Sequence, residues 1–217
     1  MNRWGRHSVH PGWPGSVGPL RVRGGLIRLR PARIRDGANW SRIRLAERAN
    51  LEPWEPSAEM DWAQRHTFSI WPAVFSGLRG EARRGRMLPY VIELDGRFCG
   101  QLTIGNVTHG ALRSAWIGYW VSSDVTGGGV ATGALALGLD HCFGPVGLHR
   151  VEATVRPENA ASRRVLAKAG FREEGLLKRY LNVDGAWRDH LLVAITAEEV
   201  DGSVAGGLVR RGLARWQ

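Results

Sequence analysis

Apolar and polar residues alternate over several short segments of this chain, a pattern typical of strands that bury one face of a sheet. The dipeptides Asp95-Gly96 and Asp184-Gly185 each separate two such segments. Asp-Gly between alternating segments is a strong hairpin signal. The pattern therefore predicts a sheet with two antiparallel hairpins. The expected strands cover residues 26–31, 89–94, 98–105, 113–121, 150–155, 171–181 and 187–196.

Helical periodicity and helix-terminal residues fill the intervals between these strands. Asp36 stands where a side chain can cap a helix, and Gly170 stands where a helix typically ends. The order is strand, helices, three antiparallel strands, helix, strand, helix and two strands, which predicts a mixed α/β fold. The expected helices follow Asp36, cover residues 58–69, end before Arg86, extend to about Phe143 and run from Asn159 to Lys168.

The 217 residues are enough for one domain with a sizeable core and short appendages. Residues 1–24 are rich in Gly, Pro, Arg and Trp without periodicity, which predicts a basic, flexible N-terminal extension. Residues 25–198 carry the periodic segments and form the expected domain. Residues 199–217 are expected to be a C-terminal tail.

The formal net charge is +10, and residues 1–35 hold eight arginines and no acidic residue. Such a basic arm attracts nucleic acid or acidic protein surfaces, and a solvated arm without a binding role fits the same composition. No apolar run approaches the roughly 20 residues of a membrane span, and the N-terminus lacks the apolar core of a signal peptide. We therefore expect a soluble, cytoplasmic protein, either a monomer or a homodimer.

The cysteines and the metal-ligand pattern are uninformative. Cys99 and Cys142 are too few for a disulfide framework and have no metal-ligand spacing. We expect two reduced thiols and no metal.

An anion-binding loop is the clearest local signal. The apolar strand that ends at Val121 leads through a short polar segment into Gly127, Gly128 and Gly129, and an Ala- and Leu-rich helix follows. Glycines let a ligand approach the backbone closely. The first turn of a helix offers unpaired N–H groups and the positive end of the helix dipole. The segment indicates a pyrophosphate site, although glycine runs also occur in loops that bind nothing.

These motifs together resemble the GCN5-related N-acetyltransferase (GNAT) superfamily over about residues 25–198. The resemblance implies a twisted, mostly antiparallel sheet flanked by helices, with acetyl-CoA in a cleft between two central strands that splay apart. The family's valine corresponds to Val121. Its Gln/Arg-x-x-Gly-x-Gly/Ala loop corresponds to Thr126, Gly127, Gly128, Gly129, Val130 and Ala131. Thr126 departs from the family's Gln or Arg, so weaker charge assistance to the pyrophosphate is expected.

A second motif of the same family follows about 30 residues later. Asn159-Ala-Ala-Ser162, with Gly170-Phe171 closing the helix, resembles the family's Asn-x-x-Ser helix. In relatives the Asn contacts the pantetheine arm and the Ser lies near the cofactor's thiol or phosphate. Asn159 as a simple helix cap is the structural alternative.

Segments 29–31, 51–55, 117–120 and 185–189 resemble the RimJ/RimL-type branch of the family. That branch acetylates the α-amine of ribosomal proteins, and some members act on other amines. The resemblance thus implies transfer of acetyl from acetyl-CoA to a protein N-terminus by direct attack. A small-molecule or antibiotic amine acetyltransferase and a non-catalytic acyl-CoA sensor are the alternatives.

The resemblance also suggests catalytic groups. Backbone N–H groups near Val121 would meet the acetyl oxygen. Ser162 resembles the serine that protonates the leaving thiolate in this branch, and Tyr180, on a strand expected to face the cleft, is a second candidate acid. The branch's glutamate base falls near Leu181 here, so no base carries over. The weaker candidate bases are His109, His149 and Glu152, and the tryptophans expected in the core rather than at the substrate are Trp54, Trp116 and Trp187.

An α-amine needs less help from a base than a lysine does. Its reference pKa is near 8, against about 10.4 for lysine, so roughly a tenth of an α-amine is already neutral at pH 7. A missing glutamate therefore favours an α-amine acceptor.

Overall fold

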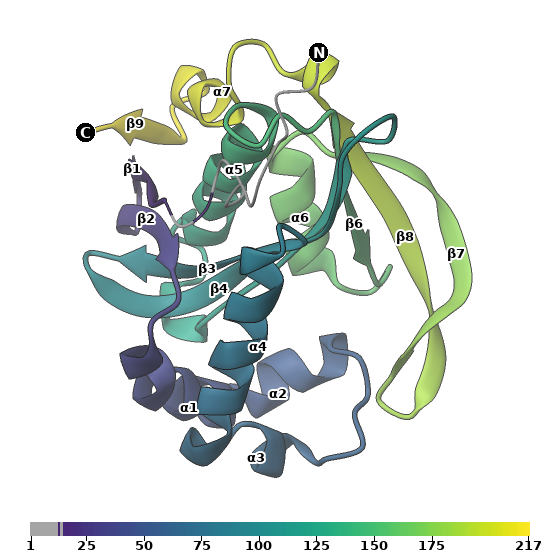
Figure 1. Ribbon diagram of the computed structural model, residues 1–217. Coiled ribbons are helices and arrows are strands. Elements are labelled where there is room, and N and C mark those ends of the chain that lie inside the picture. Colours follow the sequence, from purple (N-terminus) through teal and green to yellow (C-terminus); the bar gives the residue numbers. More distant parts are fainter. Residues whose placement is uncertain (1–12, 14) are drawn as a thin grey trace.

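A computed structural model describes residue 13 and residues 15–217 of the chain (Figure 1). Within these residues one nine-stranded sheet has the order β7-β8-β6-β5-β4-β3-β2-β1-β9. All neighbouring strands are antiparallel except β5 and β6. The strands are β1 (Val17–Val22), β2 (Gly25–Pro31), β3 (Met87–Leu94), β4 (Arg97–Thr108), β5 (Ser114–Val121), β6 (Arg150–Val155), β7 (Arg172–Val183), β8 (Ala186–Thr196) and β9 (Ala214–Trp216).

Helices cover both faces of the sheet, with α1 to α4 on one side and α5 to α7 on the other (Figure 1). The helices are α1 (Gly37–Ala46), α2 (Arg48–Leu51), α3 (Trp62–Arg65), α4 (Trp71–Arg83), α5 (Val130–Phe143), α6 (Ala160–Lys168) and α7 (Val204–Arg210). Short 3-10 turns are η1 (Ile34–Asp36), η2 (Glu52–Trp54), η3 (Phe68–Ile70), η4 (Ser123–Val125) and η5 (Ala197–Glu199). The described helices include none long and apolar enough to cross a membrane.

The two faces bury cores of different size. The larger core joins the sheet to α5, α6 and α7, and α5 is buried on almost every side, as its Ala- and Leu-rich sequence predicts. The smaller core places Trp40 of α1 and Trp71 of α4 against Val91 of β3 and Phe98 of β4. Alternate residues of β3 therefore serve opposite cores.

The centre of the sheet opens between β5 and β6. These parallel strands are paired only at their first residues, where Ser114, Ala115 and Trp116 lie beside the start of β6. β5 nevertheless continues to pair with β4 as far as Val121, which lies opposite Gly100. The expected splay is thus confirmed, and among the described strands none pairs with the β6-facing edge of β5 beyond Trp116.

The sheet extends past both limits expected for the domain. Residues 17–22, expected to be flexible, form β1, and the expected tail contains α7 and β9. β1 lies between β2 and β9, with Leu20 opposite both Ile27 and Trp216. Leu20 and Val22 supply the buried face of β1, but the surrounding Gly and Pro residues hide this short alternation in the sequence. Residues 1–12 and 14 of the expected extension lie outside the described residues.

Asp36 occupies the cap position of α1 but does not cap the helix. Its carboxylate instead accepts bonds from both terminal nitrogens of Arg30, each at 2.8 Å, and from the N–H of Arg33 at 2.7 Å. Burial of Arg30 explains the difference, because a buried guanidinium requires anionic partners. The expected helix at 58–69 is likewise wrong, since only α3 and η3 form there.

Candidate active site

The loop between β5 and α5 has the backbone expected of an anion site. Gly127 and Gly129 have φ angles of +73° and +84°, which residues with a Cβ rarely adopt. Gly129 is the N-cap of α5, and the first backbone bond of the helix runs from Gly133 N–H to Gly129 O at 2.9 Å. The preceding first-turn amides, at Val130 and Ala131, make no hydrogen bond to the described residues. These donors at the positive end of a helix form a cradle that suits a pyrophosphate.

A contact from the far edge of the sheet holds this glycine loop. Gly24, in the turn between β1 and β2, donates its N–H to Gly128 O at 2.8 Å, and Arg23 Nη2 donates to Gly127 O at 2.6 Å. A Cβ on Gly128 would lie 2.9 Å from Gly24 Cα. Gly128 is therefore required by packing as well as by any ligand. Sequence reasoning missed this support because about 100 residues separate the two turns.

Thr126 contributes to the shape of the loop. Its hydroxyl donates to Ser123 O at 2.8 Å, and its exposed side chain adds no positive charge near the first-turn amides. Val121 ends β5 immediately before this segment.

A cleft of about 180 Å³ lies between the splayed ends of β5 and β6. The residues expected from the Asn-x-x-Ser motif, Asn159 and Ser162, both line it, together with Ile117 to Tyr119 of β5. Asn159 also caps α6, because its side-chain oxygen accepts the N–H of Ser162 at 3.0 Å. The cap leaves the amide nitrogen of Asn159 available as a donor to a ligand. The full lining is Trp54, Ile117, Gly118, Tyr119, Ala153, Thr154, Val155, Arg156, Asn159, Ser162, Leu166 and His190.

Tyr119 joins Ser162 in the cleft, and sequence reasoning missed it. The phenolic oxygen lies 3.0 Å from Ser162 Oγ, and either group can donate. Burial raises the pKa of Tyr119 to about 12, so the phenol keeps its proton at neutral pH. The hydrogen bond joins β5 to α6, and no local sequence pattern predicts a contact between residues so far apart in the chain.

Tyr180, the second expected acid, does not line the cleft. It lies in a bulge of β7, is 44% exposed, and stacks edge-on against His190 with 5.7 Å between ring centres. Its ring thus covers His190 of β8, which does line the cleft. A β-bulge turns a side chain out of the regular alternation, and this explains why Tyr180 does not face the cleft although its strand was expected to.

The other expected bases lie elsewhere on the molecule. His149 is paired with Glu198 at 3.0 Å, and Glu152 accepts from Arg150 at 2.6 Å. His109 lies in the exposed turn after β4. None of the three is a lining residue of the cleft.

The three tryptophans expected in the core are partly exposed. Trp54 is 37% exposed and lines the cleft, with the Arg156 guanidinium 5.3 Å from its ring centre. Trp116 covers Gly105 of β4, and Trp187 is 63% exposed at the β7–β8 hairpin. The small core has room for Trp40 and Trp71 instead.

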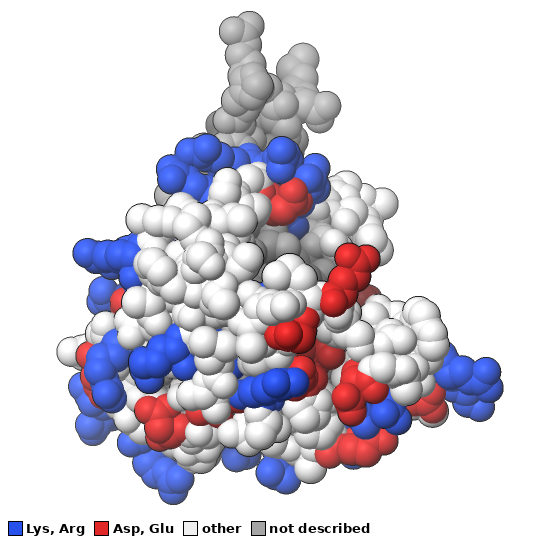
Figure 2. Space-filling model, turned by 90° about the horizontal axis from the view of Figure 1, so that it is seen from below, with Lys and Arg blue, Asp and Glu red and all other residues white. Residues whose placement is uncertain are grey.

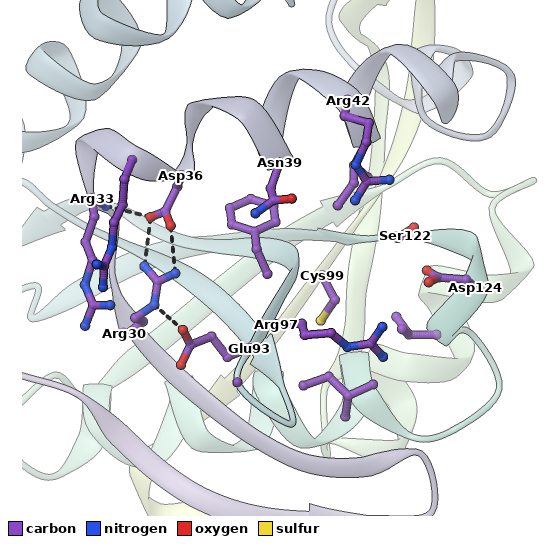
Figure 3. A pocket seen from close by; sticks show the side chains of 16 residues that line it. Arg30, Arg33, Asp36, Asn39, Arg42, Glu93, Arg97, Cys99, Ser122 and Asp124 are labelled. Carbon is purple, nitrogen blue, oxygen red and sulfur yellow. Dashed lines mark hydrogen bonds and ion pairs between the residues drawn. The ribbon is translucent and has the colours of Figure 1, made fainter.

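A second cavity, of about 450 Å³, lies beside α1 and the β3–β4 turn (Figure 3). At one side of it Arg30 pairs with Asp36 and Glu93, and Arg42 and Arg97 line the other side. It borders the start of the glycine loop at Ser122 to Val125 but shares no lining residue with the cleft.

The charge over the α1–α3 side is mixed. Figure 2 shows acidic and basic side chains interspersed there, with basic groups toward the left edge and acidic groups right of centre. Among the described residues, no group of three His, Cys, Asp or Glu side chains is placed to hold a metal ion.

Comparison with known proteins assigns the family. A model of the acetyltransferase (GNAT) domain matches residues 27–172. The solved structure of Mycobacterium smegmatis RimJ in complex with CoA-disulfide is similar, with 72% identity and a TM-score of 0.95 over 96% of this chain and 100% of that one. The ribosomal protein uS5 alanine N-acetyltransferase of Escherichia coli (strain K12) is 27% identical over 87% of this chain and 96% of that protein. The probable N-acetyltransferase YjcK of Bacillus subtilis (strain 168) is 41% identical over 46% of this chain and 56% of that protein.

The domain match covers most of the chain, and the likeness to the mycobacterial structure covers nearly all of it. The chain belongs to the GNAT family of acetyltransferases.

Proposed function

We propose that this acetyltransferase transfers acetyl from acetyl-CoA to the N-terminal α-amine of a ribosomal protein, by direct attack in a ternary complex. The cleft between β5 and β6 is the observation that carries the proposal, because residues from both sides of the sheet line it, Ser162 of α6 on the glycine loop's side and Trp54 of η2 on the opposite side. The similar proteins with 72% and 27% identity, a RimJ bound to CoA-disulfide and a uS5 alanine N-acetyltransferase, support the cofactor and the acceptor.

The glycine loop and α6 fit the two ends of the cofactor. The unpaired first-turn amides at Val130 and Ala131 suit the pyrophosphate, since they supply donors and the positive end of α5. Asn159 lines the cleft with its amide nitrogen available, and this nitrogen suits a pantetheine carbonyl.

The free edge of β5 can hold the developing oxyanion. Backbone N–H groups on that edge beyond Trp116 have no partner strand, and Val121 ends it. Donors already in place cost no reorganisation when charge develops on the acetyl oxygen.

Ser162 is placed to return a proton to the sulfur. As the new N–C bond forms, the C–S bond breaks and the thiolate takes the Ser162 proton. Tyr119, 3.0 Å from Ser162 Oγ and protonated at neutral pH, replaces that proton. The proposed acid is therefore Ser162, resupplied by Tyr119, rather than Tyr180.

The surroundings of the cleft favour the end of a chain as acceptor. The segment after η2 is joined to the β7–β8 hairpin by Ser57 N–H to Asn182 O at 2.8 Å and by Gly185 N–H to Ser57 Oγ at 3.1 Å. An acceptor that reaches the cleft beside these two joined segments fits more readily as an extended chain terminus than as a folded loop that carries a lysine. A ribosomal acceptor would place the reaction in the cytoplasm. The basic N-terminal arm, of which residues 1–12 and 14 lie outside the described part of the chain, would meet nucleic acid there.

Thiol release from acetyl-CoA with matched peptides tests the proposal. One Ala-starting peptide carries a free α-amine, a second the same sequence with a blocked α-amine and a free lysine, and spermidine serves as a small amine. We expect turnover with the first peptide only. Turnover restricted to spermidine would support a small-amine acetyltransferase, and cofactor binding with no turnover on any acceptor would support a sensor.

A further inference from the structure

His190 of β8 is the one buried titratable side chain that lines the cleft and has no part in the reaction described so far. It is 3% exposed, and it lines the same cavity as Ser162 and Gly118. A buried imidazole loses its hydration, so each of its nitrogens requires a partner or a ligand.

The hydrogen bonds of His190 define its tautomer. Nδ1 lies 3.1 Å from the backbone oxygen of Arg188. A carbonyl oxygen only accepts, so Nδ1 carries the proton and the neutral ring has its lone pair on Nε2. Within the described part of the chain, Nε2 has no hydrogen-bond partner. A buried imidazole with a fixed tautomer and a free lone pair is the arrangement of a general base.

His190 and Ser162 approach the cleft from opposite faces of the sheet. Leu191, opposite Val155 in β6, packs into the larger core on the α5–α6 side. Because side chains alternate along a strand, His190 lies on the α1–α4 side. Tyr119 packs against the larger core and bonds Ser162 on α6. A proton can therefore leave the amine on one face while another reaches the sulfur on the other face.

Neighbouring groups keep His190 oriented. Tyr180 of β7 stacks edge-on against its ring. The Arg156 guanidinium also lines the cavity but is held by Pro53 O at 3.0 Å and by Glu158 at 3.2 Å. On β8 itself, Asp189 accepts the Arg179 N–H at 2.7 Å. Arg156 is thus the charged side chain that shares the cleft with His190.

We propose that His190 is the general base of the reaction. Nε2 takes the proton that the acceptor nitrogen loses as it bonds to the acetyl carbon, directly or through one water, and later releases it to solvent. The sulfur leaves with its bonding electrons and receives the Ser162 proton. Tyr119 replaces that proton and regains its own from solvent as His190 releases one, so atoms and charges balance. This inference rests on the proposed function and supplies the base that the missing glutamate left open.

His190→Gln, compared with His149→Gln, tests the inference. The first variant removes the basic nitrogen at nearly constant size, and the second alters an exposed histidine paired with Glu198. We expect kcat to fall about 10²- to 10⁴-fold in His190→Gln, the range of general acid–base catalysis, with KM for acetyl-CoA within about twofold. His149→Gln should retain wild-type rates.

The pH profile separates catalysis from structure. A base must be neutral to accept a proton, so wild-type kcat should rise with pH as one group loses its proton and then level off. This rise of kcat with pH should disappear in His190→Gln. Added imidazole should partly restore kcat in His190→Gly. If kcat were lower in His190→Gln but still rose with pH as in the wild type, His190 would have a structural role and the proposal would be overturned. If His190→Gln does not fold, a wild-type kcat independent of pH from 5.5 to 8 would overturn it equally. Absence of wild-type turnover on every peptide would instead contradict the proposed function itself.

Discussion

In the proposed mechanism, protonation of the leaving thiolate depends on the hydrogen bond between Tyr119 and Ser162. At 3.0 Å it links a hydroxyl that lines the cleft to a phenol kept protonated by burial. Ser162 alone would be a weak acid, and a donor behind it lets the proton be replaced as it leaves. This relation makes the effects of the two side chains interdependent.

Tyr119→Phe and Ser162→Ala test this relation. We expect kcat to fall about tenfold in the first variant and about 100-fold in the second, since only the second removes the group that meets the sulfur. The double variant should be no slower than Ser162→Ala, because Tyr119 acts through Ser162. Steady-state rates with a saturating α-amine peptide measure this. Independent, multiplicative losses would show that Tyr119 does not act through Ser162.

Thr126 offers a gain-of-function test of the glycine loop. Thr126→Arg places a cation beside amides that already favour an anion, and its cost is the bond to Ser123 O. We expect acetyl-CoA to bind about three- to tenfold more tightly at low salt, with the gain lost near 1 M salt by screening. Calorimetric titration against Thr126→Gln, the uncharged family alternative, isolates the charge. Equal affinity of the two variants at low salt would contradict the loop assignment.

At the scale of elements, distant turns and helices support the site. The β1–β2 turn packs on the glycine loop, and the helices of the opposite face are held by Arg44 of α1. Arg44 pairs with Glu55, donates Nη2 to His66 Nε2 at 2.8 Å, and accepts Trp62 Nε1–H on its carbonyl at 2.7 Å. The β1–β2 turn and the Arg44 contacts each belong to a short segment, so each can be altered by mutation without changing a residue of the cleft.

Gly128→Ala tests the contact between the two turns. The added methyl would lie 2.9 Å from Gly24 Cα, which should reduce the free energy of unfolding by about 1–3 kcal/mol and weaken cofactor binding. The matched control is Gly77→Ala in α4, where nothing lies within 4 Å of the added methyl. That variant should stabilise the protein by about 0.5–1 kcal/mol. Urea unfolding of both variants measures the difference, and equal stabilities would contradict the packing role of Gly128.

His66 predicts how acid affects the helices of the α1–α4 side. Burial, and then the charge of Arg44, lower the pKa of His66 to about 4. As pH falls below about 6.5 the unfolded chain takes up a proton that the folded chain refuses. The contribution of His66 is therefore complete above about pH 6.5 and is lost toward pH 4, roughly 3 kcal/mol at about 1.36 kcal/mol per pH unit. Urea unfolding at each pH should show a shallower decline for His66→Gln than for His149→Gln, and parallel declines would contradict this.

At the scale of the whole molecule, the local motifs could be predicted from the sequence, and the contacts between residues far apart in the sequence could not. The consecutive glycines stand out in the sequence by themselves, and the family resemblance identified Asn159 and Ser162, which lie three residues apart at the start of one helix. Tyr119 and His190 reach the cleft from strands on either side of β6, and only the strand order brings them there. β1 and β9 pair across almost the full chain, and two short strands with little alternation cannot reveal that pairing.

The position of the new acetyl group tests the central claim most directly. The enzyme and acetyl-CoA are incubated with an Ala-starting peptide that carries both a free α-amine and one lysine, and fragmentation mass spectrometry locates the product's acetyl group. The account predicts acetyl on the α-nitrogen alone, with no product when that nitrogen is blocked. Acetyl on the lysine, or on a small amine but never on the peptide's N-terminus, would contradict it.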